Sequence, residues 1–327
     1  MTGDHPVGVR VLEQALGIYR DLGDRLGQAN ALFDLGPIRW LTGDRHSGVR
    51  DMEQALVIYR DLGDRLGQAN VLSYLGSERM ITGDYRGAAR VYMEELAVSR
   101  DLGDQLGQAY ALLQLGAVRC ETGDYSGAVQ VLEQALDILR DLGDRRSGAL
   151  VLCQLGIMLR EMGDYPAAAQ VLEHALDVFR GIGDRLGQAD ALLNLGVIRR
   201  ETGDYPAAGQ VLDQALGSFR ELGDRASESW ALNEKGTLYR LSGDLAQARR
   251  CHQQALEQAR AIASPSTEAH ALAGLGRCDL AAGHTAEAAV TLRQALEILK
   301  RIGAAEAADV SAELQALANA APAAQGS

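Results

Sequence analysis

Aromatic residues and long apolar runs are both scarce in this sequence. Aromatic side chains make up 5% of the 327 residues, so a hydrophobic core has to be built mainly from Leu, Ala, Val and Ile. Hydrophobic residues reach 47%, which is enough for a core and excludes wholesale disorder. No apolar run approaches about 18 residues, so the sequence predicts no membrane-spanning helix and no membrane partner. The opening Met1-Thr2-Gly3-Asp4 lacks the basic and apolar regions of a signal peptide, and we expect a cytoplasmic protein.

Lysine is almost absent as well, because 30 of the 32 basic residues are arginine and only Lys235 and Lys300 are lysine. This bias indicates a GC-rich, bacterial gene. Acidic residues number 44, which gives a net charge of −12 and opposes general affinity for nucleic acid. The cysteines form no C-x-x-C pair and occupy unrelated positions, as is typical of buried thiols in a reducing compartment: Cys120, Cys153, Cys251 and Cys278.

Motifs of catalysis and metal binding are also absent. There is no G-x-x-x-x-G-K-[ST] phosphate loop, no G-x-G-x-x-G after a strand pattern and no H-E-x-x-H zinc motif. We interpret His252 as a packing substitution rather than a metal ligand. The recurring aspartates, such as Asp24 and Asp44, are explained by helix capping and not by acid–base chemistry. We therefore expect no enzyme activity, no cofactor and no metal site.

What the sequence does contain is an ungapped repeat of forty residues, which fits eight times with seven residues left over. The segment Asp21–Ala29 returns unchanged as Asp61–Ala69. Glycine accepts the left-handed conformation that ends a helix, and a following aspartate caps the next helix. Each unit has two helical stretches separated by such pairs, first seen in Leu22-Gly23-Asp24 and Thr42-Gly43-Asp44. The period therefore predicts a series of helical hairpins.

The predicted helices are amphipathic, with apolar residues at the spacing of one helical face. Met52, Ala55 and Leu56 show this spacing in the second helix of a hairpin, and Leu32 and Leu35 in the first. A glycine recurs inside the first helix, although a helix-interior glycine costs about 0.5–1 kcal/mol relative to alanine. We expect this column to mark the close approach of the paired helix: Gly36, Gly76, Gly116, Gly156, Gly196, Gly236 and Gly276.

These residues resemble the tetratricopeptide repeat family. The resemblance is carried by Leu35-Gly36, Gly43-Asp44, an aromatic residue such as Tyr85, a small residue such as Ala88, and Ala55-Leu56. The period is longer than the usual value of about 34, and the proline that normally closes the second helix is absent. Stretched repeats of this kind are similar to those of the mitotic adaptor Partner of Inscuteable and of sensor arrays in bacterial STAND ATPases and transcription activators. The resemblance implies an all-α fold, a right-handed α-solenoid (superhelix) of helix-turn-helix repeats.

The period also predicts the order of parts along the chain. The predicted parts are an unpaired second helix in residues 1–24, seven extended repeats in 25–303, a capping helix in 304–320 and a frayed tail in 321–327. The first helix that would pair with the N-terminal helix is missing, so Leu12, Ala15 and Leu16 are expected to be partly exposed. We therefore expect either a fragment of a longer protein or a surface for self-association.

Solenoid repeats bind ligands along their concave side, which the resemblance assigns to the first helix of each hairpin. The positions expected to face a ligand vary between repeats, whereas the packing positions barely change. Either they drift because they have no packing role, or they are diversified to bind a ligand. Trp, Tyr and Arg are typical of binding hot spots and favour the second interpretation. The predicted ligand-binding residues are Asn30, Phe33, Trp40, Asn70, Tyr74, Tyr110, Gln114, Arg160, Asn194, Arg200, Trp230, Asn233 and Arg240.

Arg160, Arg200 and Arg240 occupy one position in three successive repeats. Free arginines there would form a basic stripe that binds carboxylates or phosphates. The alternative is that the glutamates at the next position neutralise the stripe, namely Glu121, Glu161 and Glu201. A free stripe predicts an extended ligand that is apolar toward the N-terminal repeats and acidic toward repeats four to six.

Three functions fit this pattern. The favoured one is a protein–protein interaction scaffold that binds a peptide or a helix in the concave groove, with a partner that carries acidic residues. The first alternative is a sensor or autoinhibitory array from a larger bacterial regulatory ATPase or transcription activator. The second alternative is a self-assembling structural module that uses the uncapped N-terminal helix.

Overall fold

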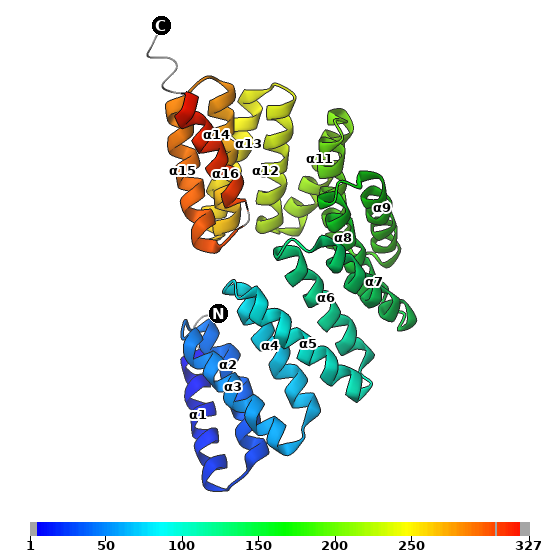
Figure 1. Ribbon diagram of the computed structural model, residues 1–327, viewed down its shortest axis with the longest axis vertical. Coiled ribbons are helices and arrows are strands. Elements are labelled where there is room, and N and C mark those ends of the chain that lie inside the picture. The colour runs from blue at the N-terminus through cyan, green and yellow to red at the C-terminus, as the bar shows by residue number, and fades with distance from the viewer. Residues whose placement is uncertain (1–4, 305, 321–327) are drawn as a thin grey trace. The chain divides into compact units, whose positions relative to one another are not determined.

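The computed structural model describes residues 5–304 and 306–320. Within these residues the chain forms sixteen helices and no strand (Figure 1), which confirms the predicted all-α repeat fold. The chain divides into two compact units, Met1–Asp144 and Arg145–Ser327. The forty-residue repeat runs through Asp144-Arg145 without a break, so the sequence gives no sign of this division. The predicted frayed tail, 321–327, lies outside the described residues.

The helices alternate between the first and the second member of a hairpin. The first unit holds α1 (His5–Asp21), α2 (Arg25–Leu41), α3 (Arg45–Leu62), α4 (Arg65–Ile81), α5 (Tyr85–Leu102), α6 (Gln105–Glu121) and α7 (Tyr125–Asp141). The second unit holds α8 (Arg145–Glu161), α9 (Tyr165–Ile182), α10 (Arg185–Glu201), α11 (Tyr205–Leu222), α12 (Arg225–Leu241), α13 (Leu245–Ala261), α14 (Pro265–Ala281), α15 (Thr285–Ile302) and α16 (Ala307–Ala320).

The Gly-Asp pairs end one helix and begin the next, as predicted. Gly63 has a left-handed backbone, with φ of 70°, and closes α3. The carboxylate of Asp64 then accepts a hydrogen bond of 2.9 Å from the Gly67 N–H and caps α4. An exception occurs at Ala263, which adopts φ of 53° although it is not glycine. Ser264 follows it at the N-cap of α14, but its hydroxyl contacts a side chain and makes no capping bond to the helix.

The recurring glycine of the first helix marks close helix packing, as predicted. A Cβ added to Gly156 on α8 would lie 2.5 Å from Cγ of Leu172 on α9. A Cβ added to Gly116 on α6 would lie 2.8 Å from Cδ2 of Leu132 on α7. The helix-propensity cost of these glycines is therefore offset by the buried side chain that the paired helix inserts against them.

Neighbouring first helices also contact one another within each unit. These contacts join α4 to α6 in the first unit, and α8, α10, α12 and α14 in the second. Among the described residues, the second helices make no comparable contacts with one another. Helices on the inner side of a bend are crowded together and those on the outer side are spread apart. We therefore call these contiguous first helices the first-helix row of each unit, and it lies on the inner side of that unit's bend.

Among the described residues, α1 packs mainly against α2, and α16 packs mainly against α15. In α1, Val7, Val11 and Ile18 are at least half exposed, whereas Leu16 is buried. The expectation that Leu16 is partly exposed is therefore wrong, because α2 already covers that side of α1. At the other end, α16 packs against α15 and buries Val310.

Candidate ligand-binding surface

Residues of the first-helix row contact residues on the next helix of the row. The Trp230 ring on α12 meets the His270 ring on α14 edge to face, with centroids 4.7 Å apart and planes at 67°. The Asn233 side chain donates a hydrogen bond of 3.4 Å to the Thr267 carbonyl oxygen on α14. Two varying positions of α12 therefore contact residues of α14 in the second unit.

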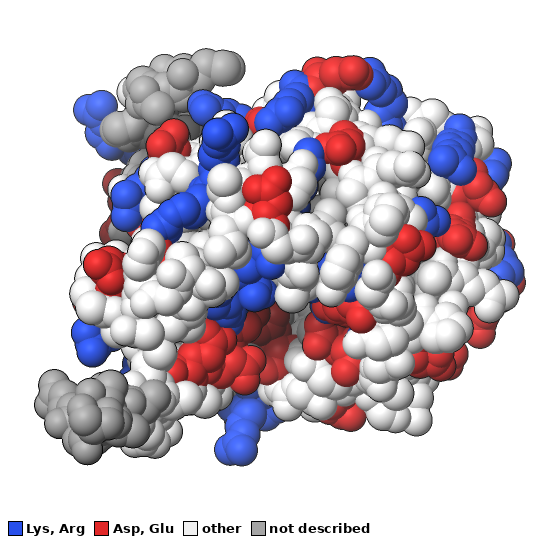
Figure 2. All heavy atoms as spheres, turned by 90° about the horizontal axis from the view of Figure 1, so that it is seen from above, with Lys and Arg blue, Asp and Glu red and all other residues white. Residues whose placement is uncertain are grey.

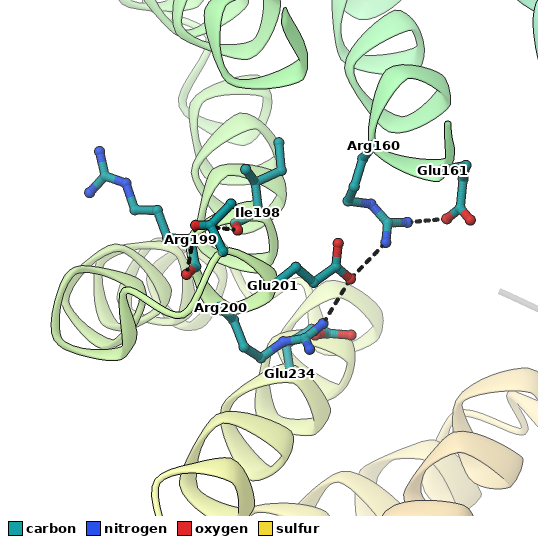
Figure 3. A network of polar contacts seen from close by, with 8 residues as sticks. Arg160, Glu161, Ile198, Arg199, Arg200, Glu201 and Glu234 are labelled. Carbon is teal, nitrogen blue, oxygen red and sulfur yellow. Dashed lines mark hydrogen bonds and ion pairs between the residues drawn. The ribbon is translucent and has the colours of Figure 1, made fainter. Parts of the chain in front are cut away.

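A chain of ion pairs links the row at α8, α10 and α12 (Figure 3). Glu201 Oε1 accepts hydrogen bonds from Arg160 at 3.0 Å and from Arg200 at 3.3 Å. Arg160 also pairs with Glu161, and Arg200 lies 3.1 Å from Glu234 Oε2. The side chains of Arg200 and Glu234 are only 13% and 17% exposed. For these two arginines the structure therefore favours the alternative in which glutamates neutralise the stripe.

Arg240 differs from the two arginines before it. It is half-buried on α12, and within the described part of the chain no carboxylate forms an ion pair with it. Burial lowers the pKa of its guanidinium, and the neighbouring charge of Arg277 lowers it further. Arg277 itself is bound by Glu313 at 2.7 Å.

The predicted asparagines of the second unit are used inside the fold. Asn233 is only 5% exposed, and its Oδ1 lies 3.1 Å from Nδ1 of His252. The side chain therefore has little surface for a ligand, and its role as a binding residue stays a prediction. Asn194 is half-buried, and its side-chain amide donates a hydrogen bond of 2.9 Å to the carbonyl oxygen of Asp190. Burial, with the charges of nearby aspartates, raises the pKa of Asp190 to about 6.

Trp230 is half-buried and packs against the core of the second unit. Its neighbour His270 lies 3.5 Å from Glu306 and 2.8 Å from the carbonyl oxygen of Ser266. Burial alone would lower the pKa of the imidazole of His270. The hydrogen bonds with Glu306 and Ser266, together with the charges of Glu306 and Glu234, outweigh burial and raise that pKa. Trp230 is therefore only partly exposed, and its ring contact with His270 joins α12 to α14.

In the first unit the predicted aromatic residues differ in exposure. Phe33 and Tyr74 are half-buried and pack against the core. Burial raises the pKa of Tyr74 to about 12, so its hydroxyl stays protonated. Trp40 is 36% exposed, and the Arg45 guanidinium lies 5.6 Å from the centre of its ring. Tyr110 is 46% exposed and is the most accessible aromatic residue among the predicted ones.

Three polar residues complete the predicted set in the first unit. Asn30 is exposed, and its Oδ1 accepts a hydrogen bond of 2.7 Å from the Tyr59 hydroxyl. Asn70 is exposed and Gln114 is half-buried. Asn70 and Gln114 therefore remain accessible to solvent at least in part, as a ligand-binding position requires.

Sequence reasoning missed the partners that make the ion-pair chain. Glu234 and Glu313 were not predicted as site residues, although both bind an arginine of the first-helix row. The repeat period relates equivalent positions, whereas these pairs join non-equivalent positions on successive helices. A signal was present in the acidic residues of the varying columns, but only the stacking of helices shows which arginine each one reaches.

On the face drawn in Figure 2, basic and acidic side chains are interspersed among uncharged ones. Many charged side chains of the described residues form ion pairs, as in Arg25 with Asp61 at 2.8 Å and Arg146 with Asp184 at 2.7 Å. No helix in the described ranges is long and apolar enough to cross a bilayer.

This geometry defines a class, the α-helical repeat proteins whose hairpins stack through glycine-mediated contacts. A family model described as tetratricopeptide repeat matches residues 67–141, 147–221 and 227–301. These segments cover more than half of the chain, which therefore belongs to the tetratricopeptide repeat family. No curated protein sequence matches it.

Several solved structures share this fold. A Rap protein complexed with Competence and Sporulation Factor aligns with a TM-score of 0.64 at 15% identity, covering 97% of this chain and 98% of that one. The apo quorum sensor NprR from B. thuringiensis aligns with a TM-score of 0.55 at 14% identity, covering 92% and 81%. A STAND protein with a tetratricopeptide repeat sensor from Pyrococcus horikoshii aligns with a TM-score of 0.59 at 17% identity, covering 95% and 49%. At these identities the likeness shows the fold.

Proposed function

We propose that the chain is a protein–protein interaction scaffold that binds a peptide or a helix along the first-helix row of its repeats. The observation that carries this proposal is the row itself, in which varying, partly exposed residues follow one another on contiguous helices. The Rap protein complexed with Competence and Sporulation Factor supports it, because that complex is formed on the same fold. The protein acts by binding alone, without a catalytic step.

Peptide-library selection followed by single substitutions tests this function. Tyr110 on α6 and Leu150 on α8 are exposed residues of the first-helix row, one in each unit. Each is replaced by alanine and compared with a matched control on a second helix, Met93→Ala on α5 or Val290→Ala on α15. Truncation of a hot spot costs about 2 kcal/mol, so at least one row variant should weaken a selected peptide more than about tenfold. The proposal would be refuted if the control variants lost as much peptide affinity as the row variants, or if neither row variant lost affinity.

A sensor or autoinhibitory array is the second candidate. The alignment with the STAND protein favours it, because 95% of this chain aligns with about half of a protein that carries a tetratricopeptide repeat sensor. The ligand would then relieve or impose a restraint on an effector domain encoded in the same gene. Sequencing the gene on both sides of this chain tests it, since a nucleotide-binding domain in frame is expected.

Self-assembly is the third candidate. The exposed Val7, Val11 and Ile18 on α1 offer an apolar face to a second copy of the chain. Light scattering over a concentration series should then show a rising mass, and Val11→Asp should abolish the rise. A constant monomer mass in both proteins would exclude this candidate and leave the first two standing.

A further inference from the structure

Arginine occurs at the last turn of the first helix in three successive repeats, and two of the three are already paired. Arg160 and Arg200 share Glu201, as Figure 3 shows. Arg277, one helix further along the row, is bound by Glu313 through both Nε and Nη2. Arg240 lies between these pairs on α12 and has no such partner in the described residues.

The repeat explains why Arg240 is unpaired. The residue after Arg160 is Glu161, and the residue after Arg200 is Glu201, but Arg240 is followed by Leu241. The carboxylates that come from the next repeat are missing too. Ala281 stands where Glu201 serves Arg160, and Gly274 stands where Glu234 serves Arg200. Every position that supplies a carboxylate to the two earlier arginines is uncharged around the third.

The side chains near Arg240 supply no replacement charge. Burial, together with the charges of Arg240 and Arg277, lowers the pKa of His252 to about 4, so this imidazole is neutral near pH 7. Burial raises the pKa of the Cys278 thiol, which is neutral as well. Glu313 also acts on Arg240, but it is held by Arg277. Among the residues that the structure describes, this half-buried arginine is therefore left without an ion-pair partner of its own.

The donors of such a guanidinium remain open to a ligand, and their fork can bind a carboxylate in two places. We propose that Arg240 is the anchor for one carboxylate of an acidic peptide that lies along the first-helix row, with Arg277 beside it. The peptide source of this carboxylate rests on the proposed scaffold function. The anion site itself does not.

Simple anions test the site without any peptide. Protein labelled with ¹⁵N-arginine is titrated with acetate, and the Nε–Hε signals are followed, with the Arg240 signal assigned by its loss in Arg240→Gln. We expect a saturable shift of the Arg240 signal and no such shift for Arg160 or Arg200, which are already paired. An Arg240 signal that does not move, or arginine signals that all move alike, would overturn the site. Inorganic phosphate is titrated in parallel, and binding at least tenfold tighter than acetate would overturn the choice of a carboxylate.

An oriented peptide library then tests the ligand class. The native protein should select Asp or Glu at one position, and Arg240→Gln should lose that preference while Arg250→Gln, a variant of an exposed arginine on α13, keeps it. Peptide binding with no acidic preference would refute the role of Arg240 and leave the scaffold function intact. A saturable acetate shift without any peptide binding would instead refute the scaffold function and leave the anion site. Because Arg240 forms no ion pair with any residue that the structure describes, Arg240→Gln should not lower the thermal stability of the fold.

Discussion

Arg200 on α10 lies 3.1 Å from the carboxylate of Glu234 on α12, and this contact joins two first helices of the row. Both side chains are mostly buried, so the pair differs from the solvated ion pairs on the surface. Arg200→Ala leaves the Glu234 carboxylate without this partner, and we expect unfolding to become easier by about 1–3 kcal/mol. Chemical denaturation measures the change, and Arg250→Ala, at an exposed site, should change it by less than about 0.5 kcal/mol.

A double-mutant cycle separates the pair from its surroundings. Replacing both Arg200 and Glu234 with methionine should cost less than the sum of the two single changes, because no charge is then left uncompensated. A strictly additive cycle would mean that the 3.1 Å contact contributes nothing to stability. Peptide affinity should depend less on Arg200 than on Arg240. Arg200 would have to break its ion pairs with Glu201 and Glu234 before it could bind a carboxylate of the peptide.

Helix-interior glycines have opposite roles at two positions of the second unit. A Cβ at Gly156 would lie 2.5 Å from Cγ of Leu172, whereas a Cβ at Gly217 on α11 would meet nothing within 4 Å. Gly156→Ala should therefore destabilise the unit by about 1–3 kcal/mol through overpacking. Gly217→Ala should stabilise it by about 0.5–1 kcal/mol, because alanine has the better helix propensity. Denaturation midpoints that moved in the same direction would contradict this account of the repeated glycine.

The sequence predicts the hairpins well because each repeat specifies its own turns and packing face. The Gly-Asp turns, the glycine column and the all-α fold can be predicted from residues within a single repeat of forty. The pairing of Arg160 and Arg200 with glutamates could be stated only as one of two alternatives, because it depends on how repeats stack. The burial of Asn233 was missed for the same reason, since its partners Thr267 and His252 come from other helices.

The division into two units also escapes prediction from the repeat. Residues on either side of Asp144-Arg145 follow the same period, and nothing in their composition marks a boundary. A compact unit is defined by the sum of many contacts between several helices. A repeated sequence pattern of similar hairpins does not show where one compact unit ends and the next begins.

Ala263 is strained where the other turns use glycine. Its φ of 53° lies in the left-handed region, which costs an L-residue about 1–2 kcal/mol. Ala263→Gly should therefore raise the free energy of unfolding by about 1 kcal/mol, measured by denaturant titration. Ala282→Gly is the matched control, because Ala282 caps the next helix with φ of −86° and gains nothing from glycine. Equal effects of the two changes would show that the strain at Ala263 is relieved in solution.

Glu95 is a buried carboxyl group on α5 where the neighbouring repeats have Ala55 and Ala135. It is 5% exposed, and one of its oxygens has no hydrogen-bond partner. Burial raises the pKa of Glu95 from its ordinary value to about 7, although a hydrogen bond with Ser73 opposes the shift. Its folded pKa is thus above its unfolded pKa, so the folded state holds the proton more tightly.

The sign of the pH dependence follows from this difference. The contribution of Glu95 to the free energy of unfolding is fully present below a pH of about 4.5 and is lost as the pH rises through about 7. The free energy of unfolding falls by about 3 kcal/mol in total over this range. Glu95→Gln cannot ionise, so relative to the native protein it should gain stability between these pH values and stay more stable above them. Glu133→Gln, at an exposed glutamate on α7, serves as the control and should follow the native curve. Denaturation of all three proteins from pH 5 to pH 8 measures the effect. If the free energy of unfolding of the native protein changed with pH in parallel with that of Glu95→Gln over this range, Glu95 would ionise at the same pH in the folded and unfolded states.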